Sequence, residues 1–298
     1  MAMRVGFIGL GLMGQPMALN VAKAKFPLAV CNRTPAKAEP LRTAGATVAK
    51  TPRAVAEEAD VVVTMVSGPA DVEEVVLGPE GVAAGAKSGS VLIDMSTVGP
   101  QDSQRIAAAI ADRGMAMLDA PVSGGVMRAE QGTLTIMVGG PESVFGRCLP
   151  VLQVMGDKVI RAGEQGMGSL TKLVNNLISG GIVALIGEAL LLGVKGGLDP
   201  KGMLEVLSTG TARSAMLETY GPLILQGDFA PRFPLKHMHK DFGLIVQTAQ
   251  TFGVPLPTTA LIHQIYGAAR AAGKGELNFS AVMTLWEEIA GVKVRSRE

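Results

Sequence analysis

Short apolar runs alternate with amphipathic stretches through the first half of the chain. Runs rich in Val, Ile and Leu predict strands at Arg4–Gly9, Leu28–Cys31, Val61–Val66, Val91–Asp94, Met117–Asp119 and Leu134–Val138. The segments between them predict helices at Gly14–Lys25, Thr34–Ala44, Arg53–Ala59, Pro69–Leu77 and Gln101–Arg113. Repeated strand–helix–strand units with continuous apolar strands are typical of a parallel sheet covered by helices on both faces. We therefore expect a doubly wound α/β domain.

The pattern changes near Pro141. Beyond this residue no further β-branched runs occur, whereas Ala, Leu, Gly and Met recur at helical spacing. A glycine-rich passage over 162–168 leads into a long apolar segment, Ser169–Gly196. We predict a doubly wound domain over 1–163 and an all-α domain over 164–298, joined by this long helix.

Breaks in the helical half are marked by Gly and Pro. After the long helix, Asp199 and Pro200 suit the cap and first turn of a new helix. Further breaks are predicted at Gly221-Pro222, 231–234 and 255–257. The stretch 173–198 resembles a membrane span, but its Asn, Glu and Lys side chains are costly in hydrocarbon, which favours a buried helix and no membrane association.

Composition narrows the possible functions. The 298 residues carry 27 Lys+Arg against 26 Asp+Glu, and aromatic residues make up only 4% of the chain. Neither a cationic surface nor stacking platforms are therefore indicated, so we expect no nucleic-acid partner. Charged residues are 18% and hydrophobic residues 48%, which leaves apolar surface to be hidden. A homodimer or homotetramer would hide it.

The cysteines and the N-terminus carry further expectations. Cys31 and Cys148 belong to no CxxC or Cys/His cluster, so we interpret both as buried thiols and expect neither a disulfide nor a zinc site. The first residues run straight into an apolar strand without the pattern of a signal peptide. A cytoplasmic protein is the expectation.

A glycine motif follows the first predicted strand. Gly9-x-Gly11-x-x-Gly14 stands between that strand and a helix, which is the context of a Rossmann dinucleotide site. The glycines permit a tight turn, close approach of the pyrophosphate and close helix packing, while the helix N-terminus favours the phosphates. The expected cofactor-binding residues here are Gly9, Leu10, Gly11, Leu12, Met13 and Gly14.

The end of the second strand bears on the choice of nucleotide. NAD-selective sites usually carry an acidic residue there for the ribose hydroxyl, but this chain has Asn32-Arg33-Thr34. An arginine and a hydroxyl can bind a 2′-phosphate, so NADP(H) is preferred and NAD(H) remains possible. In the alternative interpretation, Arg33 is a solvated loop residue and Asn32 only caps the next helix.

Hydride transfer at a carbinol carbon needs a proton donor or acceptor nearby. Neither a Cys/His metal set nor a Tyr-x-x-x-Lys motif is present, so lysine or histidine is left for this role. Lys172 lies near the start of the long helix with Asn176 one turn on, and both can face one substrate atom. An apolar cleft would lower the lysine pKa toward the working range. A surface lysine is the plainer alternative.

Several ordered motifs together resemble one family. They are GFIGLGLMGQPMA near the N-terminus, DAPVSGG over Asp119–Gly125, GTLTIMVGG over Gly132–Gly140, the segment Gly168–Asn176, and Lys240-Asp241. This set resembles the β-hydroxyacid dehydrogenases, including 3-hydroxyisobutyrate dehydrogenase, tartronate semialdehyde reductase and the glyoxylate/succinic semialdehyde reductases. The resemblance covers the whole chain.

The resemblance implies roles for individual residues. Lys172 is similar to the catalytic lysine, with Asn176 as its hydrogen-bonding partner and Asn175 adjacent. Ser123, Gly124 and Gly125 resemble the turn that binds the substrate carboxylate. Thr97 is expected near the nicotinamide ribose, and Lys240 is expected to close over the cofactor, with Asp241 holding that corner. Met65, Val66 and Ser67 resemble the loop beside the cofactor, although many members have proline where this chain has Ser67.

Other polar residues are assigned lesser roles. His237 and His239 are two apart on a predicted helix and point away from each other, so we predict no metal site. Asp94 and Asp119, at strand ends, are interpreted as turn formers rather than catalysts.

The leading hypothesis is an NADP(H)-dependent reductase of a small carboxylate-bearing aldehyde such as tartronate semialdehyde, glyoxylate or succinic semialdehyde. The subfamily signal is split, because 233–241 resembles the semialdehyde and glyoxylate reductases, whereas 286–294 resembles tartronate semialdehyde reductase or hydroxymethylglutarate dehydrogenase. An alternative is oxidation of a 3-hydroxy acid such as 3-hydroxyisobutyrate or serine. A non-catalytic interaction module and an imine reductase are disfavoured by the presence of Lys172.

Overall fold

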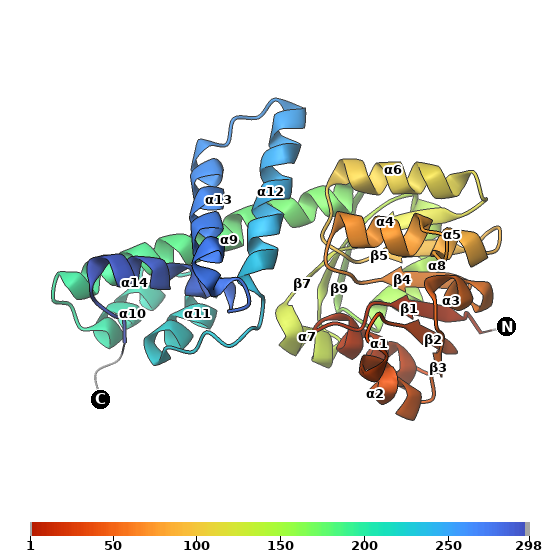
Figure 1. Ribbon diagram of the computed structural model, residues 1–298, viewed down its shortest axis with the longest axis horizontal. Helices are drawn as coiled ribbons and strands as arrows, with labels where there is room; N and C mark the ends of the chain where they lie inside the picture. The colour runs from red at the N-terminus through yellow and green to blue at the C-terminus, as the bar shows by residue number, and fades with distance from the viewer. Residues whose placement is uncertain (1, 296–298) are drawn as a thin grey trace. The chain divides into compact units, whose positions relative to one another are not determined.

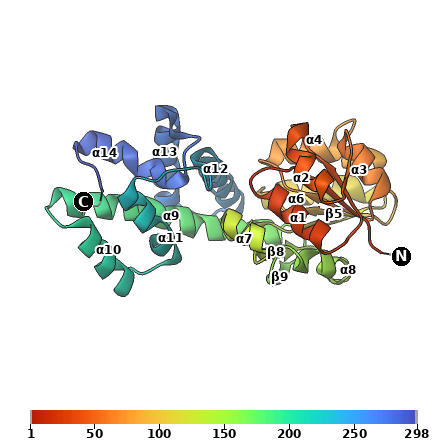
Figure 2. The same ribbon diagram turned by 90° about the horizontal axis from the view of Figure 1, so that it is seen from below.

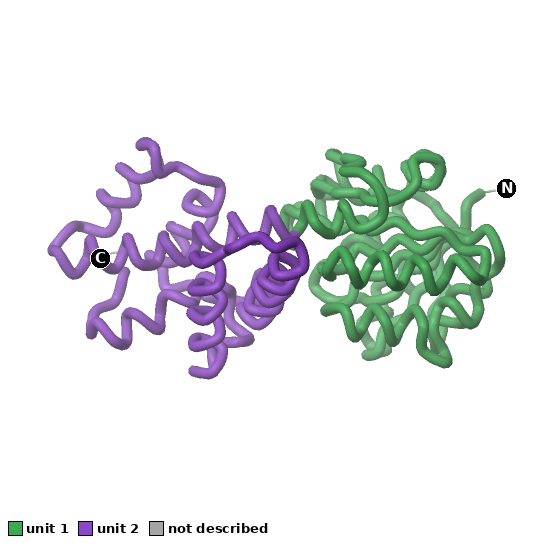
Figure 3. The backbone as a smooth tube through the Cα atoms, turned by 90° about the horizontal axis from the view of Figure 1, so that it is seen from above, with its two compact units in different colours: residues 1–172 green, residues 173–298 purple. Residues whose placement is uncertain are grey.

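The computed structural model describes residues 2–295. It divides into two compact units, Met1–Lys172 and Leu173–Glu298, coloured separately in Figure 3. The division falls inside one long helix, whereas the sequence places the domain boundary after residue 163. That boundary stays a prediction.

The first unit is built on a nine-stranded sheet, visible in Figure 1. Its strands follow the order β3-β2-β1-β4-β5-β6-β8-β7, and β9 pairs with β8. The strands are β1 (Val5–Ile8), β2 (Leu28–Cys31), β3 (Thr47–Val48), β4 (Val61–Thr64), β5 (Val91–Asp94), β6 (Ala116–Asp119), β7 (Val122–Ser123), β8 (Thr135–Gly139) and β9 (Lys158–Gly163). The sequence prediction is therefore confirmed for the strands that form the centre of the sheet.

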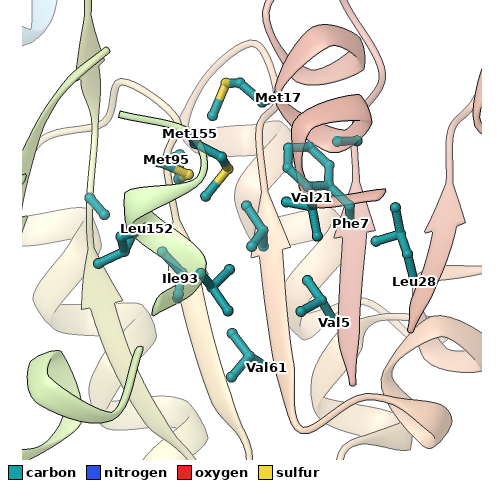
Figure 4. Close-up of a cluster of buried hydrophobic side chains, with 14 of the residues drawn as sticks. Val5, Phe7, Met17, Val21, Leu28, Val61, Ile93, Met95, Leu152 and Met155 are labelled. Carbon is teal, nitrogen blue, oxygen red and sulfur yellow. The ribbon is translucent and has the colours of Figure 1, made fainter. Parts of the chain in front are cut away.

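Helices cover both faces of this sheet, as predicted. They are α1 (Gly14–Lys23), η1 (Pro35–Ala38), α2 (Glu39–Thr43), α3 (Pro52–Glu58), α4 (Pro69–Leu77), α5 (Val82–Gly85), α6 (Pro100–Ala111), α7 (Gly125–Gln131) and α8 (Glu142–Gln153). Alternate strand residues divide the apolar core: Val61 and Val63 belong to the layer with α1, α2, α7 and α8, while Val62 belongs to the layer with α3 to α6. Figure 4 shows the first layer, with the Phe7 ring beside Val21.

Two expectations for this unit are wrong. The sheet is not parallel throughout, because β8 runs antiparallel to β6 and β7. The chain after Pro141 is not wholly helical either, since β9 follows α8 and pairs in parallel with β8. The residues of β9 alternate between exposed and half-buried, and the sequence of the strand contains no continuous apolar run. Its strand conformation depends on pairing with β8.

The order of the strands locates the site. β1 lies between β2 and β4, so the chain crosses β1 on its way from β3 to β4. Ligands of open α/β sheets bind at such a switch point, beyond the carboxyl ends of the strands. The register pairs Ile8 with Thr64, Thr64 with Asp94, and Asp94 with Asp119, so the last residues of β1, β4, β5 and β6 lie along this edge.

The second unit is helical, as predicted. Its helices are the part of α9 (Met167–Lys195) beyond Lys172, α10 (Pro200–Thr209), α11 (Ala215–Gln226), α12 (Leu235–Phe252), α13 (Pro257–Ala269), the π-helical turn η2 (Arg270–Lys274), the 3₁₀ helix η3 (Phe279–Met283) and α14 (Thr284–Ala290). The predicted cap is confirmed, because Asp199 Oδ2 accepts the N–H of Gly202 at 2.8 Å. The predicted break at Gly221-Pro222 is wrong, since both residues lie within α11.

The long helix α9 runs unbroken in Figures 1 and 2. Its buried residues, including Val183 and Leu190, belong to the apolar clusters of the second unit. Its Val174, Ile178, Leu185 and Leu192 are more than half exposed. By length and composition alone this helix could cross a membrane, and 44% of its most apolar window is buried. One face thus serves as core and another remains uncovered in the single chain.

Candidate active site

The glycine loop forms at the carboxyl end of β1. Gly9 has φ +96°, a left-handed conformation that favours glycine, and a Cβ there would overlap the carbonyl of Met65. A Cβ at Gly14, where α1 begins, would overlap the carbonyl of Gly9. By contrast, the space beside Gly11 is open within 4 Å of an added Cβ. No side chain of these three glycines therefore covers the backbone where a pyrophosphate would approach the start of α1, so the loop fits a dinucleotide.

Asn32 holds this loop from the end of β2. Its Oδ1 accepts the N–H of Leu10 at 2.8 Å, and its Nδ2 donates to the carbonyl of Thr34 at 2.9 Å. Both ends of the amide are thus used to fix the glycine loop against the next turn. The guanidinium of Arg33, 90% exposed, lies 3.8 Å from Asp71, and Thr34 is exposed as well. These two side chains are accessible to a 2′-phosphate.

Buried polar residues support the predicted loop at Met65, Val66 and Ser67. The N–H of Val66 donates to Ser96 Oγ at 2.9 Å. In turn, Asp94 Oδ1 accepts the Ser96 N–H at 3.1 Å and the Thr64 hydroxyl at 2.8 Å. Full burial raises the pKa of Asp94 to about 6, and these hydrogen bonds oppose that rise.

Asp94 is therefore more than a turn former, because it anchors the residues that hold the loop. Its Oδ2 atom is buried without a hydrogen bond. Sequence reasoning missed Thr64 and Ser96, although a strand-end Asp followed two residues later by Ser was the available signal. The neighbouring Thr97, predicted at the nicotinamide ribose, is half-buried just beyond this network. Leu12, from the glycine loop, is 54% exposed and Met13 is half-buried.

The predicted carboxylate turn lies beyond β7. Ser123, the last residue of β7, is half-buried, while Gly124 and Gly125 are exposed. Both glycines have positive φ, +139° and +70°, so the chain reverses here in a conformation that other residues rarely adopt. The helix α7 starts at Gly125. Consecutive N–H groups in such a turn suit a carboxylate.

Lys172 lies in the second turn of α9 and is only 9% exposed. The surface-lysine interpretation is therefore wrong. Asn176, one turn further along the same helix, is 4% exposed. A buried ammonium near a helix start is unfavourable unless it has a partner, and such lysines are frequently functional.

Polar residues in the second unit form a connected group. Asn175 Nδ2 donates to Asn176 Oδ1 at 3.0 Å, and Asn176 Nδ2 donates to Asp241 Oδ2 at 2.7 Å. The ammonium of Lys240 lies 3.1 Å from Asp241 Oδ1. Asp241 is fully buried, so its charge is compensated by these neighbours. The structure thus joins Asn175, Asn176, Lys240 and Asp241 within one unit.

The two histidines on α12 diverge, as predicted. His237 faces Phe233, with ring centroids 6.0 Å apart, whereas His239 stacks on His263 at 4.6 Å. Over residues 2–295, no three His, Cys, Asp or Glu side chains are grouped as a metal site. Both cysteines are buried free thiols, as expected, and burial raises their pKa.

Comparison with known families covers both halves of the chain. Residues 4–163 match the model of the NAD-binding domain of 6-phosphogluconate dehydrogenase. Residues 166–286 match the model described as the NAD-binding domain of NADP-dependent 3-hydroxyisobutyrate dehydrogenase.

Individual relatives agree along almost the full length. The chain is 40% identical to 2-(hydroxymethyl)glutarate dehydrogenase of Eubacterium barkeri over 294 residues, 98% of each chain. It is 37% identical to 2-hydroxy-3-oxopropionate reductase of Escherichia coli over 292 residues, 98% of this chain and 100% of the relative. The chain belongs to the β-hydroxyacid dehydrogenase family.

A solved structure extends this agreement to the fold. The crystal structure of 3-hydroxyisobutyrate dehydrogenase from Salmonella typhimurium superposes with a TM-score of 0.87 at 33% identity, covering 95% of this chain and 99% of that one. This β-hydroxyacid dehydrogenase is thus an NAD(P)-dependent hydroxyacid dehydrogenase or reductase with a Rossmann domain followed by a helical domain.

Proposed function

We propose that the enzyme reduces a small aldehyde that carries a carboxylate, such as tartronate semialdehyde, glyoxylate or succinic semialdehyde, to the hydroxy acid. The observation that carries the proposal is the burial of Lys172 in a unit that also contains the glycine loop and the Ser123–Gly125 turn. The relationship to 2-hydroxy-3-oxopropionate reductase supports the same substrate class.

Each group has a distinct task in this proposal. The Ser123–Gly125 turn binds the substrate carboxylate through backbone N–H groups and the Ser123 hydroxyl. Lys172 hydrogen-bonds the aldehyde oxygen and delivers its proton to the alkoxide that forms there. Asn176, one turn further along this helix, is the hydrogen-bonding partner of Lys172, with Asn175 adjacent. A nicotinamide nucleotide, when bound, supplies the hydride.

We further propose a preference for NADP(H), with NAD(H) as a possible second cofactor. The support is the exposed Arg33 guanidinium beside Thr34 at the end of β2, where no acidic side chain directly follows the strand. An arginine can bind a 2′-phosphate with charge-assisted hydrogen bonds. The match of 166–286 to an NADP-dependent family agrees with this choice. Lys240 closing over the cofactor, with Asp241 behind it, is part of the same proposal.

The opposite direction, oxidation of a 3-hydroxy acid such as 3-hydroxyisobutyrate or serine, uses the same residues with Lys172 accepting the proton. Its support is the fold and sequence shared with 3-hydroxyisobutyrate dehydrogenase of Salmonella typhimurium. Rates of aldehyde reduction and of hydroxy-acid oxidation, measured side by side, distinguish the two proposals.

We also propose a homodimer or homotetramer located in the cytoplasm. The exposed Val174, Ile178, Leu185 and Leu192 follow one another along α9 and would be covered by a second copy. Replacing Ile178 and Leu185 by Glu should yield a particle of about 31 kDa by light scattering, calculated from the 30.8 kDa chain. A monomeric wild type would overturn this proposal.

The test of the function is a panel of small semialdehydes and hydroxy acids assayed with both nucleotides. Lys172→Ala should lower turnover by about 1,000-fold or more while NADPH affinity stays within about twofold, because the loss is confined to proton transfer and orientation. Lys195→Ala, at the other end of the same helix, is the matched control. Undiminished turnover in Lys172→Ala would contradict the catalytic assignment, and a wild type inactive on the whole panel would favour a non-catalytic module.

A further inference from the structure

Asp119 connects two distant segments of the first unit. Its Oδ1 accepts the N–H of Gly166 at 2.8 Å and the Gln165 side-chain amide at 3.1 Å, and its Oδ2 accepts the N–H of Ser169 at 2.6 Å. All three donors come from the turn that leads into α9 or from its first turn. The carboxylate therefore caps α9 although it lies on β6, 47 residues before Gly166.

This cap lies in the interior of the unit. Asp119 is 0% exposed, and burial raises the pKa of its carboxyl against the opposing effect of the Gly166 and Ser169 N–H groups. A buried carboxylate with several N–H donors is held in one orientation, because any other orientation leaves its oxygens without partners. The start of α9 is thereby fixed to the end of β6.

The backbone packs tightly at the same place. A Cβ at Gly168 would overlap the carbonyl oxygens of Asp119 and Met137. The N-terminal turn of α9 thus lies directly against β6 and β8, without intervening side chains. Small displacements of this turn are opposed both by the carboxylate and by backbone contact.

The chain on either side of this anchor contains groups of the proposed active site. After Asp119 it runs through three buried residues into the Ser123–Gly125 turn. After Ser169 it continues through one turn of α9 to Lys172. One carboxylate therefore ties together the segment that binds the substrate carboxylate and the segment that contains the lysine.

We propose that Asp119 is a positioning residue that fixes Lys172 relative to the Ser123–Gly125 turn. The inference rests on the proposed function, since it assigns the two groups to one substrate. The distance between a bound carboxylate and the proton donor selects the chain length of the substrate. Asp119 thus governs the orientation of the reacting aldehyde without touching it.

Asp119→Asn tests this directly, because it keeps the volume and one oxygen acceptor but replaces the other oxygen by an amide donor, which faces at least one N–H group that needs an acceptor. We expect kcat to fall about 10-fold to 100-fold, as for a misplacement on the order of 1 Å, with the NADPH dissociation constant unchanged within about twofold. The isotope effect on kcat with 4-deuterated NADPH should increase, since hydride transfer becomes slower relative to product release.

Asp199→Asn is the control for the loss of a helix cap away from the site, because the exposed Asp199 caps α10 in the second unit through a bond to the Gly202 N–H. It should leave kcat and the isotope effect unchanged. In a Lys172→Ala background, Asp119→Asn should cause no further loss of the residual rate, since its effect acts through Lys172.

Stability is separated from positioning by assaying well below the thermal midpoint of each variant. Wild-type kcat and isotope effect in a folded Asp119→Asn variant would overturn the proposal. Should that variant fail to fold, Gln165→Ala removes one donor from a half-buried side chain and should show the same changes to a smaller degree. Unchanged kinetics in Gln165→Ala would then count against it. A wild type that is inactive on every substrate would refute the proposed function instead. The positioning of Lys172 can then still be tested by labelling with trinitrobenzenesulfonate, which should be faster in Asp119→Asn than in wild type.

Discussion

The nucleotide loop of the first unit and the polar group of the second are built in different ways. In the first, Gly9, Gly14 and Asn32 lie within a short stretch of chain, and the backbone conformation follows from their residue types. In the second, Asn176 and Asp241 are 65 residues apart and meet only because α9 and α12 pack together. Local chemistry defines one group and helix packing defines the other, so they should respond differently to substitution.

The largest expected effect is on the second group. Asp241→Ala leaves the buried Asn176 amide without its acceptor and removes the carboxylate that lies 3.1 Å from the Lys240 ammonium. We expect a loss of about 3 kcal/mol in the free energy of unfolding. This is at the lower end of the range for removing one partner of a buried ion pair, because Lys240 is partly exposed to solvent. Urea denaturation followed by circular dichroism measures it.

A surface pair provides the control for that experiment. Arg213→Ala removes the exposed ion pair with Glu218 and should leave the unfolding midpoint unchanged. Equal losses in the two variants would show that burial is not what makes the Asp241 group costly to break.

Next comes Gly9→Ala in the local group. An alanine at this left-handed position would collide with the Met65 carbonyl, so the loop must shift. NADPH affinity should fall about 100-fold, equivalent to about 3 kcal/mol, as followed by quenching of nucleotide fluorescence. Gly45→Ala has a similar φ of +92° with open space around it, and it should affect affinity little.

A third prediction concerns the pH dependence that Asp94 imposes on the first unit. Because burial raises its pKa from 3.8 to about 6, the folded protein holds a costly charge above that pH, and the cost disappears as the carboxyl becomes protonated. The stability contribution of Asp94 therefore falls as pH rises through this range. Asp94→Asn lacks the charge. The difference in free energy of unfolding, variant minus wild type, should therefore increase by about 1–2 kcal/mol from about pH 5 to about pH 8.

Asp112→Asn, at an exposed position, controls for general charge effects in this titration. A difference between Asp94→Asn and wild type that is independent of pH would show that the charge of Asp94 is not responsible.

The smallest expected effect is that of Arg33→Ala. Loss of the guanidinium should weaken NADPH binding about tenfold, or about 1.4 kcal/mol, and leave NADH binding unchanged, because only NADPH has a 2′-phosphate. Arg42→Ala, another exposed arginine, serves as the control. Equal weakening of both nucleotides would exclude a role in selecting NADPH.

Elements with clear signals at both ends have the bounds that the sequence predicts. β2, β5 and α4 have the predicted bounds, since apolar runs or proline and glycine mark both ends. In contrast, β9 was missed because its residues alternate only between exposed and half-buried. The break expected at Gly221-Pro222 is absent because Pro222 is accommodated within α11.

The candidate site divides in the same way. The conformation of Gly9 could be predicted because spacing and residue type within a few positions define its surroundings, whereas the role of Arg33 stays a prediction. Lys172 was singled out by its place on a helix and by resemblance, but only the fold shows that it is buried. Asp94 and Asp119 were underestimated, since their partners come from other strands and from the start of α9.

By itself the sequence determined the alternation of strands and helices, the conformation of the glycine loop and the membership of a dehydrogenase family. These depend on hydrophobic periodicity and on the backbone freedom of glycine, which act over a few residues. The tertiary structure decided which strand runs antiparallel, which charges are buried and what compensates them. Such properties depend on contacts between residues far apart in the chain, which exist only once the sheet and helices have packed.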